Sequence, residues 1–180
     1  MAPANLRFCP RCGADGYGYH GGKFWRCGSC GFTHYHNVAA SASVIVETEG
    51  RVLMIVRGKE PGKGLLSLPG GFIDPDERAE DAAVRECREE TGVEAVDLSF
   101  VGSWPNDYAY GDVLYKTCDL YFSARAASAP AGSAPGPEAD PSGEVAGFRL
   151  VDPAEIETAP IAFESARRAL LAWRLREKGR

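Results

Sequence analysis

The 180-residue sequence lacks any long apolar run, and this lack excludes a class of fold. No stretch approaches the roughly 20 apolar residues that a helix needs to cross a bilayer, so we expect neither a membrane bundle nor a membrane partner. Residues 1–10 also lack the apolar segment of a secretory signal peptide. We therefore expect the protein in the cytoplasm, where disulfides are rare and paired cysteines more often bind a metal.

Basic charge is in short supply as well. The chain has 20 Lys and Arg against 25 Asp and Glu, so its formal net charge is −5. Because sequence-independent binding to nucleic acid depends on cations that neutralise phosphates, nucleic acid is not an expected partner. The deficit has one source: residues 74–97 hold ten acids and three bases and carry −7, so the rest of the chain carries +2.

The remaining composition, with 44% hydrophobic and 25% charged residues, is typical of a folded chain. At roughly 150 residues per domain, the length predicts one domain with a small attachment. Residues 1–37 have few aliphatic residues and form the attachment, and residues 38–180 form the domain. Residues 126–143, rich in proline, glycine, alanine and serine, are expected to be a flexible loop of that domain.

Segments with strand-like or helical spacing, bounded by glycine and proline, outline the domain. The expected strands are residues 38–47, 52–57, 96–102, 113–124 and 144–151, with a short apolar piece at 65–68. The expected helices are residues 76–91, which Gly92 ends, and residues 160–178. Strands mixed with two helices make this an α/β fold.

Two C-x-x-C pairs supply four closely spaced cysteines: Cys9, Cys12, Cys27 and Cys30. Four thiolates at this spacing close a tetrahedron around one Zn²⁺, and no position stays open, so the zinc is expected to be structural. The alternatives are redox disulfides or thiols without a metal, although one redox site would not need a second C-x-x-C pair.

The attached module by itself carries +3 and contains Phe24 and Trp25, which is compatible with a ribbon that binds nucleic acid. A solvated surface and a small local core explain the same residues equally well. Its histidines are other potential metal ligands, but four cysteines already fill a tetrahedral site.

Glu86, Glu89 and Glu90 have the spacing that puts three carboxylates on one helical face. Packed like charges destabilise a helix unless cations neutralise them, and hard oxygen ligands suit Mg²⁺ or Mn²⁺. On their own, such acids are most often a solvated face. Here a Gly-Gly turn lies directly before the helix, and Arg85 can pair with the acids and orient them.

These residues match a known pattern. Gly71, Glu77, Arg85-Glu86, Glu89-Glu90 and Gly92-Val93 reproduce the Nudix box, G-x5-E-x7-R-E-U-x-E-E-x-G-U, in which U is a bulky aliphatic residue. Cys87 departs from the box, and it should fill the usual aliphatic place as a small hydrophobic residue. The chain thus resembles the Nudix hydrolases, which implies an α/β/α sandwich with a mixed sheet, preceded here by the small zinc ribbon.

The resemblance also implies a reaction and its residues. The reaction is hydrolysis of a nucleoside diphosphate linked to another group, with Mg²⁺ or Mn²⁺ as the catalytic metal. By resemblance to the family, the metal ligands are Glu86, Glu89, Glu90 and the Gly70 carbonyl, with Glu77 outside these direct ligands and acting through water or the metal. The catalytic residues within the box are then these three glutamates and Arg85, which orients the carboxylates.

Nudix enzymes often take a further glutamate from outside the box as a metal ligand or base, and Glu144 is the expected residue here. It opens the last strand in the pattern E-V-x-x-x-x-L, although an ordinary exposed acid would fit the same sequence. Asp112, Asp119 and Glu138 are weaker candidates. Arg57, which ends a strand near the box, is a candidate phosphate ligand, and a surface arginine is the alternative.

A zinc ribbon before a Nudix domain resembles the NADH pyrophosphatase branch of the family. That branch carries the array S-Q-P-W-P-F-P-x-S after the box, of which residues 101–108 keep a serine, a tryptophan and a proline. Trp104, Tyr108 and Tyr110 are the expected substrate-binding aromatics, because an aromatic face can stack on any nucleobase. NADH, ADP-ribose or a related dinucleotide is therefore favoured over a nucleoside triphosphate.

Other interpretations share the fold. A catalytically silent Nudix module could sense a nucleotide or bind RNA, but such a module need not keep all three box glutamates. An isomerase of prenyl diphosphates would need a catalytic cysteine and a different box. Many Nudix proteins dimerise, so a homodimer built through the ribbon or the first strands is a candidate assembly.

Overall fold

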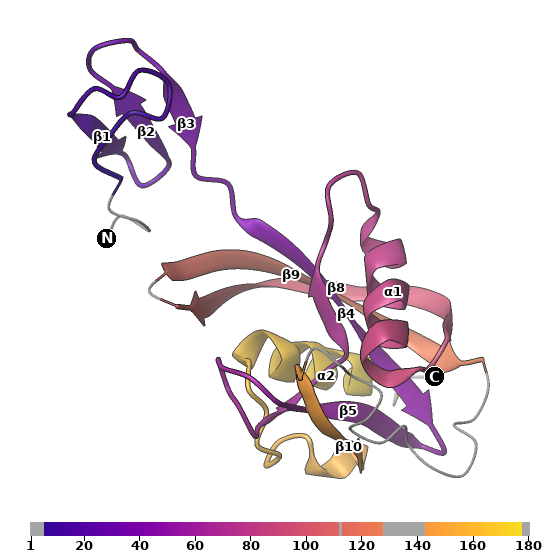
Figure 1. Cartoon of the computed structure of the whole chain (residues 1–180). Coiled ribbons are helices and arrows are strands. Elements are labelled where there is room, and N and C mark those ends of the chain that lie inside the picture. The colour runs from indigo at the N-terminus through magenta and orange to yellow at the C-terminus, as the bar shows by residue number, and fades with distance from the viewer. Residues whose placement is uncertain (1–5, 112, 128–142, 178–180) are drawn as a thin grey trace. The chain divides into compact units, whose positions relative to one another are not determined.

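Figure 1 shows the computed structural model of the chain, which describes residues 6–111, 113–127 and 143–177. Most of the loop expected at residues 126–143, and the candidate acids Asp112 and Glu138, lie outside the described residues. The chain divides into two compact units, Met1–Ala39 with Asp107–Lys116, and Ala40–Asn106 with Thr117–Arg180. Among the described helices, none has the length and apolar character needed to span a membrane.

The first unit contains a three-stranded sheet of order β1-β2-β3. Its antiparallel strands are β1 (Tyr17–His20), β2 (Phe24–Cys27) and β3 (Thr33–Tyr35). The turn between β1 and β2 needs Gly21 and Gly22, whose φ angles of 56° and 70° lie in the left-handed region. The buried residues of this sheet form one small cluster: Cys9, Tyr17, Trp25 and Cys27. Its core therefore includes two of the predicted zinc ligands.

The second unit is built on a seven-stranded sheet. Five strands follow the order β10-β5-β4-β9-β8, while β6 pairs with β5 and β7 pairs with β4. The strands are β4 (Ala39–Thr48), β5 (Arg51–Arg57), β6 (Leu66–Ser67), β7 (Gly70–Phe72), β8 (Ala95–Tyr110), β9 (Val113–Ala126) and β10 (Val145–Val151).

Two helices, α1 (Ala79–Thr91) and α2 (Glu164–Glu177), cover opposite faces of this sheet (Figure 1). Successive residues of β4 separate onto the two faces, as the pleat of a strand requires: Val44 packs in the cluster under α1, and Ile45 packs in the cluster under α2. The expected α/β/α sandwich is confirmed. Cys87 of α1 is fully buried on the side of the helix that packs on the sheet, in the place of the aliphatic residue of the box.

The first helix begins three residues later than predicted, at Ala79 instead of residue 76. Asp76 has a φ of 67°, which is left-handed backbone that cannot begin a right-handed helix. The Glu77 carboxylate instead accepts the Asp74 N–H at 3.0 Å, which closes a turn before the helix. The helix ends where predicted, because Gly92 takes a φ of 70° and its N–H donates to the Arg88 carbonyl.

Two further elements differ from their predicted bounds. β8 runs to Tyr110, well past the predicted end at residue 102, because exposure alternates along most of its length, as in a half-buried strand. α2 begins at Glu164 and not at residue 160, since Ile161 forms a β-bridge with Leu66. A short 3₁₀ helix, η2 (Pro153–Glu155), precedes α2.

Asp119 on β9 joins three elements beneath α2. Its buried carboxylate accepts hydrogen bonds from Ser41 of β4 at 2.8 Å, Thr117 of β9 at 2.6 Å and Ser165 of α2 at 2.8 Å. Burial raises the pKa of the adjacent Tyr121, and the charge of Asp119 raises it further. The hydroxyl groups therefore hold Asp119 as part of the domain's internal structure.

Replacing Asp119 by alanine is expected to lower the free energy of unfolding by about 3 kcal/mol, because buried hydroxyl groups would lose a charged acceptor. Urea unfolding measures this change. Asp107→Ala is the matched control, since Asp107 is exposed and forms a surface ion pair with Lys116, and it should cost less than about 0.5 kcal/mol. Equal losses in the two variants would contradict the role given to Asp119.

Candidate active site

The Gly-Gly turn before the helix forms β7, which pairs with β4. Gly70 has a φ of 152°, and a Cβ there would lie 2.3 Å from the Ser43 hydroxyl oxygen. At Gly71, a Cβ would lie 2.6 Å from the carboxylate carbon of Glu86. Glycine alone permits these approaches, so the Glu86 carboxylate lies directly against the backbone of β7.

Arg85 of α1 binds several acids of the box. Its Nε and Nη2 donate to the two oxygens of Glu77 at 2.8 and 2.9 Å. Its Nη1 donates to Glu86 at 2.7 Å and to Glu89 at 3.3 Å. Nη2 also donates to the Phe72 carbonyl at 3.2 Å. The guanidinium therefore fixes three carboxylates relative to one another and to β7.

The pair between Glu77 and Arg85 stays charged over the whole physiological range. Hydrogen bonds from Arg85 and from the Asp74 N–H lower the pKa of Glu77 to about 2. The same contact with Glu77 raises the pKa of Arg85 above its usual value. A lasting ion pair thus joins α1 to the turn that precedes it.

In contrast to Glu77, both Glu86 and Glu90 have raised pKa values. Burial raises the pKa of Glu90 to about 8, and the charges of Glu86 and Glu144 act in the same direction, while the Gly70 N–H, donated at 2.8 Å, opposes them. Burial also raises the pKa of Glu86, against the effect of Arg85. Carboxyl groups with a raised pKa hold a proton more readily, and a bound cation would favour their ionised form.

Two residues from outside the box lie within electrostatic reach of it. The Glu144 carbonyl accepts the Gly58 N–H at 2.6 Å, which fixes the start of β10 beside the end of β5. The charge of Glu144 raises the pKa of both Glu86 and Glu90, and the charge of Arg57 lowers that of Glu90. The structure therefore brings Glu144 and Arg57 towards the box glutamates.

Sequence reasoning did not identify the neighbours of these two residues. Lys59 Nζ lies 3.5 Å from the Glu144 carboxylate. The Arg57 guanidinium lies 4.8 Å from the centroid of the Phe163 ring, and its Nε donates to the Pro61 carbonyl at 2.6 Å. The loop at residues 58–64 was marked only by glycine and proline, and no residue type in it signalled these contacts.

The three predicted substrate aromatics do not belong to one unit. Trp104 is half-buried in the second unit, with its ring 5.8 Å from that of Tyr121 and folded over Gly102. It therefore contributes to the core under α2. Tyr108 and Tyr110 lie on the part of β8 that belongs to the first unit.

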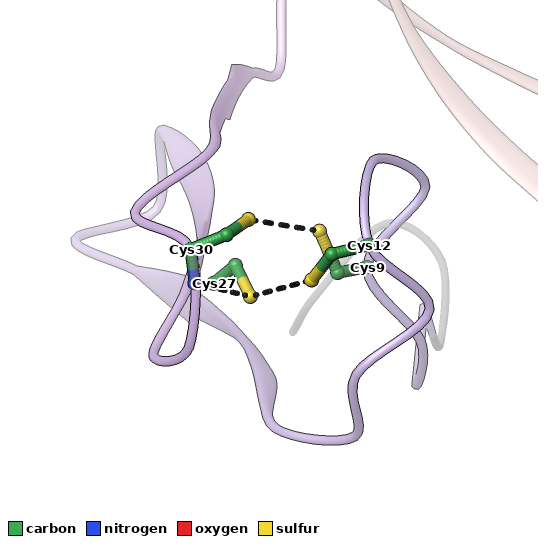
Figure 2. Close-up of side chains that lie close together, drawn as sticks. All are labelled: Cys9, Cys12, Cys27 and Cys30. Carbon is green, nitrogen blue, oxygen red and sulfur yellow. Dashed lines mark hydrogen bonds between the residues drawn. The ribbon is translucent and has the colours of Figure 1, made fainter.

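Four cysteine sulfurs converge in the first unit, as Figure 2 shows. All four Sγ atoms lie within 4.8 Å of one another, with 3.8 Å between Cys9 and Cys30 and 3.7 Å between Cys12 and Cys27. Zn–S bonds of about 2.3 Å give a tetrahedron with edges of about 3.8 Å, whereas a disulfide measures about 2.05 Å. The cluster fits zinc, and all four thiols are free of disulfides.

Each C-x-x-C pair closes a tight turn at a glycine. Gly13 N–H donates to the Cys9 carbonyl at 2.8 Å, and Gly31 N–H donates to the Cys27 carbonyl at 3.1 Å. The Cys30 N–H donates to the Cys27 sulfur at 3.4 Å, and this bond lowers the pKa of Cys27 to about 6. This turn therefore favours the thiolate of Cys27, which is the form that binds zinc, whereas the neighbouring cysteines raise the pKa of Cys12 to about 12.

Tyr17 adds a second sign of a bound ion. Its buried hydroxyl has no hydrogen-bond partner among the described residues. Burial raises the pKa of Tyr17, and the charges of Cys9, Cys27 and Cys30 raise it further. A buried hydroxyl needs an acceptor, and a zinc-bound thiolate beside it is a suitable one.

The box and its neighbouring strands lie within a family domain, since the family profile of the NUDIX domain matches residues 36–174. The chain belongs to the NUDIX family. In this NUDIX chain the match includes the box glutamates, Arg57 and Glu144, and it leaves the four cysteines outside.

Curated relatives of this NUDIX chain are named "NAD-capped RNA hydrolase NudC". The relative from Pseudomonas putida (strain W619) is 36% identical over 126 residues, which cover 63% of this chain and 45% of the relative. The relative from Vibrio vulnificus (strain CMCP6) is 30% identical over 100 residues, which cover 56% of this chain and 38% of the relative. The matches thus span less than half the length of these relatives.

Solved structures have the same fold. A NUDIX hydrolase from Nitrosomonas europaea superimposes with a TM-score of 0.63 at 24% identity, covering 92% of this chain and 88% of that one. The NUDIX domain of Shewanella oneidensis NrtR, solved in complex with ADP ribose, gives a TM-score of 0.60 at 20% identity, covering 78% and 88%. Both agree with the α/β/α sandwich.

Proposed function

We propose that the chain is a Mg²⁺- or Mn²⁺-dependent hydrolase of the diphosphate bond in a nucleoside diphosphate linked to another group. The observation that carries this proposal is the contact of Arg85 with Glu77, Glu86 and Glu89 beside the glycines of β7. A carboxylate cluster fixed by an internal cation, next to glycine backbone that bears no side chain of its own, suits a hard metal and an anionic substrate.

The metal would be held by Glu86, Glu89, Glu90 and the Gly70 carbonyl, with Glu77 outside the direct ligands. When bound, a divalent cation supplies charge neutralisation of the diphosphate and a lowered pKa of water. Among the described residues, only the cysteines bring three or more ligand atoms within 4.8 Å, and the box glutamates are engaged by Arg85 and Gly70 instead. Loading of the site would exchange these contacts for metal contacts.

The protein's own groups have separate tasks in this proposal. Arg85 orients Glu77, Glu86 and Glu89 through its hydrogen bonds. Glu144 is the group that we propose accepts the proton of the attacking water, since its charge acts at Glu86 and Glu90. Arg57, positioned by Pro61 and Phe163, binds a phosphate oxygen of the substrate.

We favour NADH, ADP-ribose or a related dinucleotide as the substrate. The NudC relatives are named for a substrate that ends in NAD, and a NUDIX neighbour was solved with ADP ribose. Of the predicted aromatics Trp104, Tyr108 and Tyr110, we propose only Trp104 for stacking on a base or nicotinamide ring at this site, because the other two belong to the first unit. The free thiols suit a reducing compartment, so we place the activity in the cytoplasm.

The test is a panel of NADH, ADP-ribose, FAD, coenzyme A, diadenosine tetraphosphate and deoxynucleoside triphosphates with Mg²⁺ or Mn²⁺. Chromatography of the products should show cleavage between the two phosphates, faster than of any triphosphate: NADH should give AMP and the reduced nicotinamide mononucleotide, and ADP-ribose should give AMP and ribose 5-phosphate. No turnover of any compound would refute the enzyme proposal and favour a silent nucleotide-sensing module. The three intact box glutamates do not support such a silent module, because it would not need them.

Metal binding is expected to weaken as pH falls from about 8 to about 6, because protons compete for a carboxyl whose pKa is raised to about 8. The raised pKa of Glu90 also determines how the stability of the metal-free protein changes with pH. Without metal, the folded protein holds a proton on Glu90 that the unfolded chain, in which the glutamate pKa has its ordinary value of 4.5, releases. Stability therefore falls as pH rises from 4.5 towards 8, and metal should cancel that loss.

Thermal unfolding with and without Mg²⁺ across this pH range measures the effect. In Glu90→Gln the unfolding temperature should depend less on pH, since the glutamine side chain does not titrate. Glu77 does not contribute in this window, because its pKa is no higher than 4.5 in either state and changes stability only in stronger acid. A pH dependence that is unchanged in Glu90→Gln would contradict the assignment.

A further inference from the structure

The sheet of the first unit has an outer face opposite its buried cluster. Residues directly across an antiparallel ladder share a face, as do residues two apart on a strand. The register therefore assigns two rows to this outer face: His20, Phe24 and Tyr35 in one row, and Gly18, Arg26 and Thr33 in the other. The buried Trp25 and Cys27 lie on the opposite face.

The first row is a line of aromatic rings across all three strands. The ring centroids of His20 and Phe24 are 5.7 Å apart, and those of Phe24 and Tyr35 are 5.5 Å apart. Tyr35 is 61% exposed. The His20 ring lies over Gly18, where a Cβ would be only 3.2 Å from Nε2. Because residue 18 has no side chain, the ring can cover the strand at that position.

The charge of this module favours an anionic partner. Residues 1–37 carry +3, so the remaining residues of the chain, which carries −5 in total, hold −8. Arg26 is exposed on the outer face itself, and Lys23 is exposed in the preceding turn. A second copy of the same positive face would be repelled, whereas a polyanion would be attracted.

We propose that this outer face binds single-stranded RNA, with bases stacked on His20, Phe24 and Tyr35 and phosphates bound by Arg26 and Lys23. Aromatic rings and cations interleaved on a sheet are the chemistry that binds unpaired bases. RNA is favoured over DNA because the relatives are named for an RNA substrate. The net charge of the whole chain conceals this surface, since most of the acids belong to the other unit.

The binding is independent of the proposed function, and only its use in catalysis rests on that function. If the NUDIX site cleaves a nucleotide at the end of an RNA, a ribbon on the same chain raises the local concentration of that RNA. The KM for a capped RNA should then depend on the outer face, while turnover of free NADH should not.

Fluorescence anisotropy with a labelled oligouridine of about 12 nucleotides tests the proposal with the full chain, at low salt. The double variant Phe24→Ala/Tyr35→Ala should bind at least about tenfold more weakly than the parent. Arg26→Gln should lower the slope of log affinity against log salt concentration by about one, which corresponds to the loss of one phosphate contact. Zinc content, measured by metal analysis, should stay at one ion per chain in each variant.

Phe100→Ala is the matched control. Phe100 is an aromatic residue with 54% exposure on the second unit, outside the box and outside the ribbon, so RNA affinity should not change. Should the double variant lose zinc, Tyr35→Ala alone replaces it, because Tyr35 is 61% exposed whereas Phe24 is half-buried. NADH hydrolysis should be the same in the parent and in all ribbon variants.

Several results would overturn the proposal. These are no RNA binding by the parent, full RNA binding by a zinc-loaded double variant, or equal affinity for the DNA of the same sequence. Dimerisation that the double variant abolishes, without RNA binding by the parent, would assign the face to a second copy. Failure of NADH hydrolysis with retained RNA binding would refute the proposed function and leave this inference intact.

Discussion

Glu89→Gln is expected to lower kcat/KM for the best dinucleotide substrate by about 10³-fold, because a lost metal ligand removes several kcal/mol of charge stabilisation. Glu89 is the most suitable box glutamate for this test. Its side chain is 61% exposed and contacts Arg85 only at 3.3 Å, so the substitution leaves the Glu77–Arg85 pair in place. Stability should therefore change little while activity is lost.

Glu80→Gln is the control for Glu89→Gln, since Glu80 lies in the first turn of the same helix and forms a surface ion pair with Arg78. It removes the same charge from α1 but should keep parental activity. The two variants are compared by initial rates over a range of Mg²⁺ concentrations, with thermal unfolding as the check on folding. Full activity of Glu89→Gln at every Mg²⁺ concentration would remove Glu89 from the metal site.

Removal of zinc is expected to unfold the ribbon, because binding energies of about 10–16 kcal/mol are typical of structural zinc in small modules. The three strands have only one small buried cluster, and two of its members are themselves cysteines of the site. Without the ion, the four cysteines would be linked only by weak thiol contacts, at 3.8 Å between Cys9 and Cys30 and at 3.7 Å between Cys12 and Cys27.

Amide hydrogen exchange read by mass spectrometry localises this loss. In Cys27→Ser, or after a chelator, peptides from β1, β2 and β3 should exchange as unfolded chain, while peptides from α1 and β5 keep their protection. Tyr17→Phe is a milder variant for comparison with Cys27→Ser, because it keeps all four ligands and removes only the Tyr17 hydroxyl, which has no hydrogen-bond partner among the described residues. It should release zinc to a chelator faster than the parent. Absence of zinc in the purified parent would contradict the ribbon assignment.

Local spacing explains what could be predicted from the sequence. The spacing of Glu86, Glu89 and Glu90 fixes their shared helical face, and two C-x-x-C pairs bring their own sulfurs together. The core pattern of β4 and the end of α1 at Gly92 follow from equally local signals. These features need little information about the rest of the chain.

Contacts between distant segments explain what could not be predicted. The carboxylate of Asp119 meets Ser41 and Ser165 only after two strands and a helix have packed. The start of α1 was placed too early because the left-handed backbone at Asp76 leaves no mark in residue type. Glu144 was identified only through resemblance to a family, and its partner Lys59 was not identified.

The junction between β5 and β10 has a consequence for how the chain tolerates insertions. Val145 pairs with Arg57 and Gly147 with Val56, so Ala146 is an extra residue that forms a bulge. The Gly58 N–H bond to the Glu144 carbonyl adds a second anchor at the same point. Because both anchors belong to the end of β5, the position of Glu144 does not depend on the length of the segment before it. We therefore expect the register of β10 to stay the same when residues are added or removed before it.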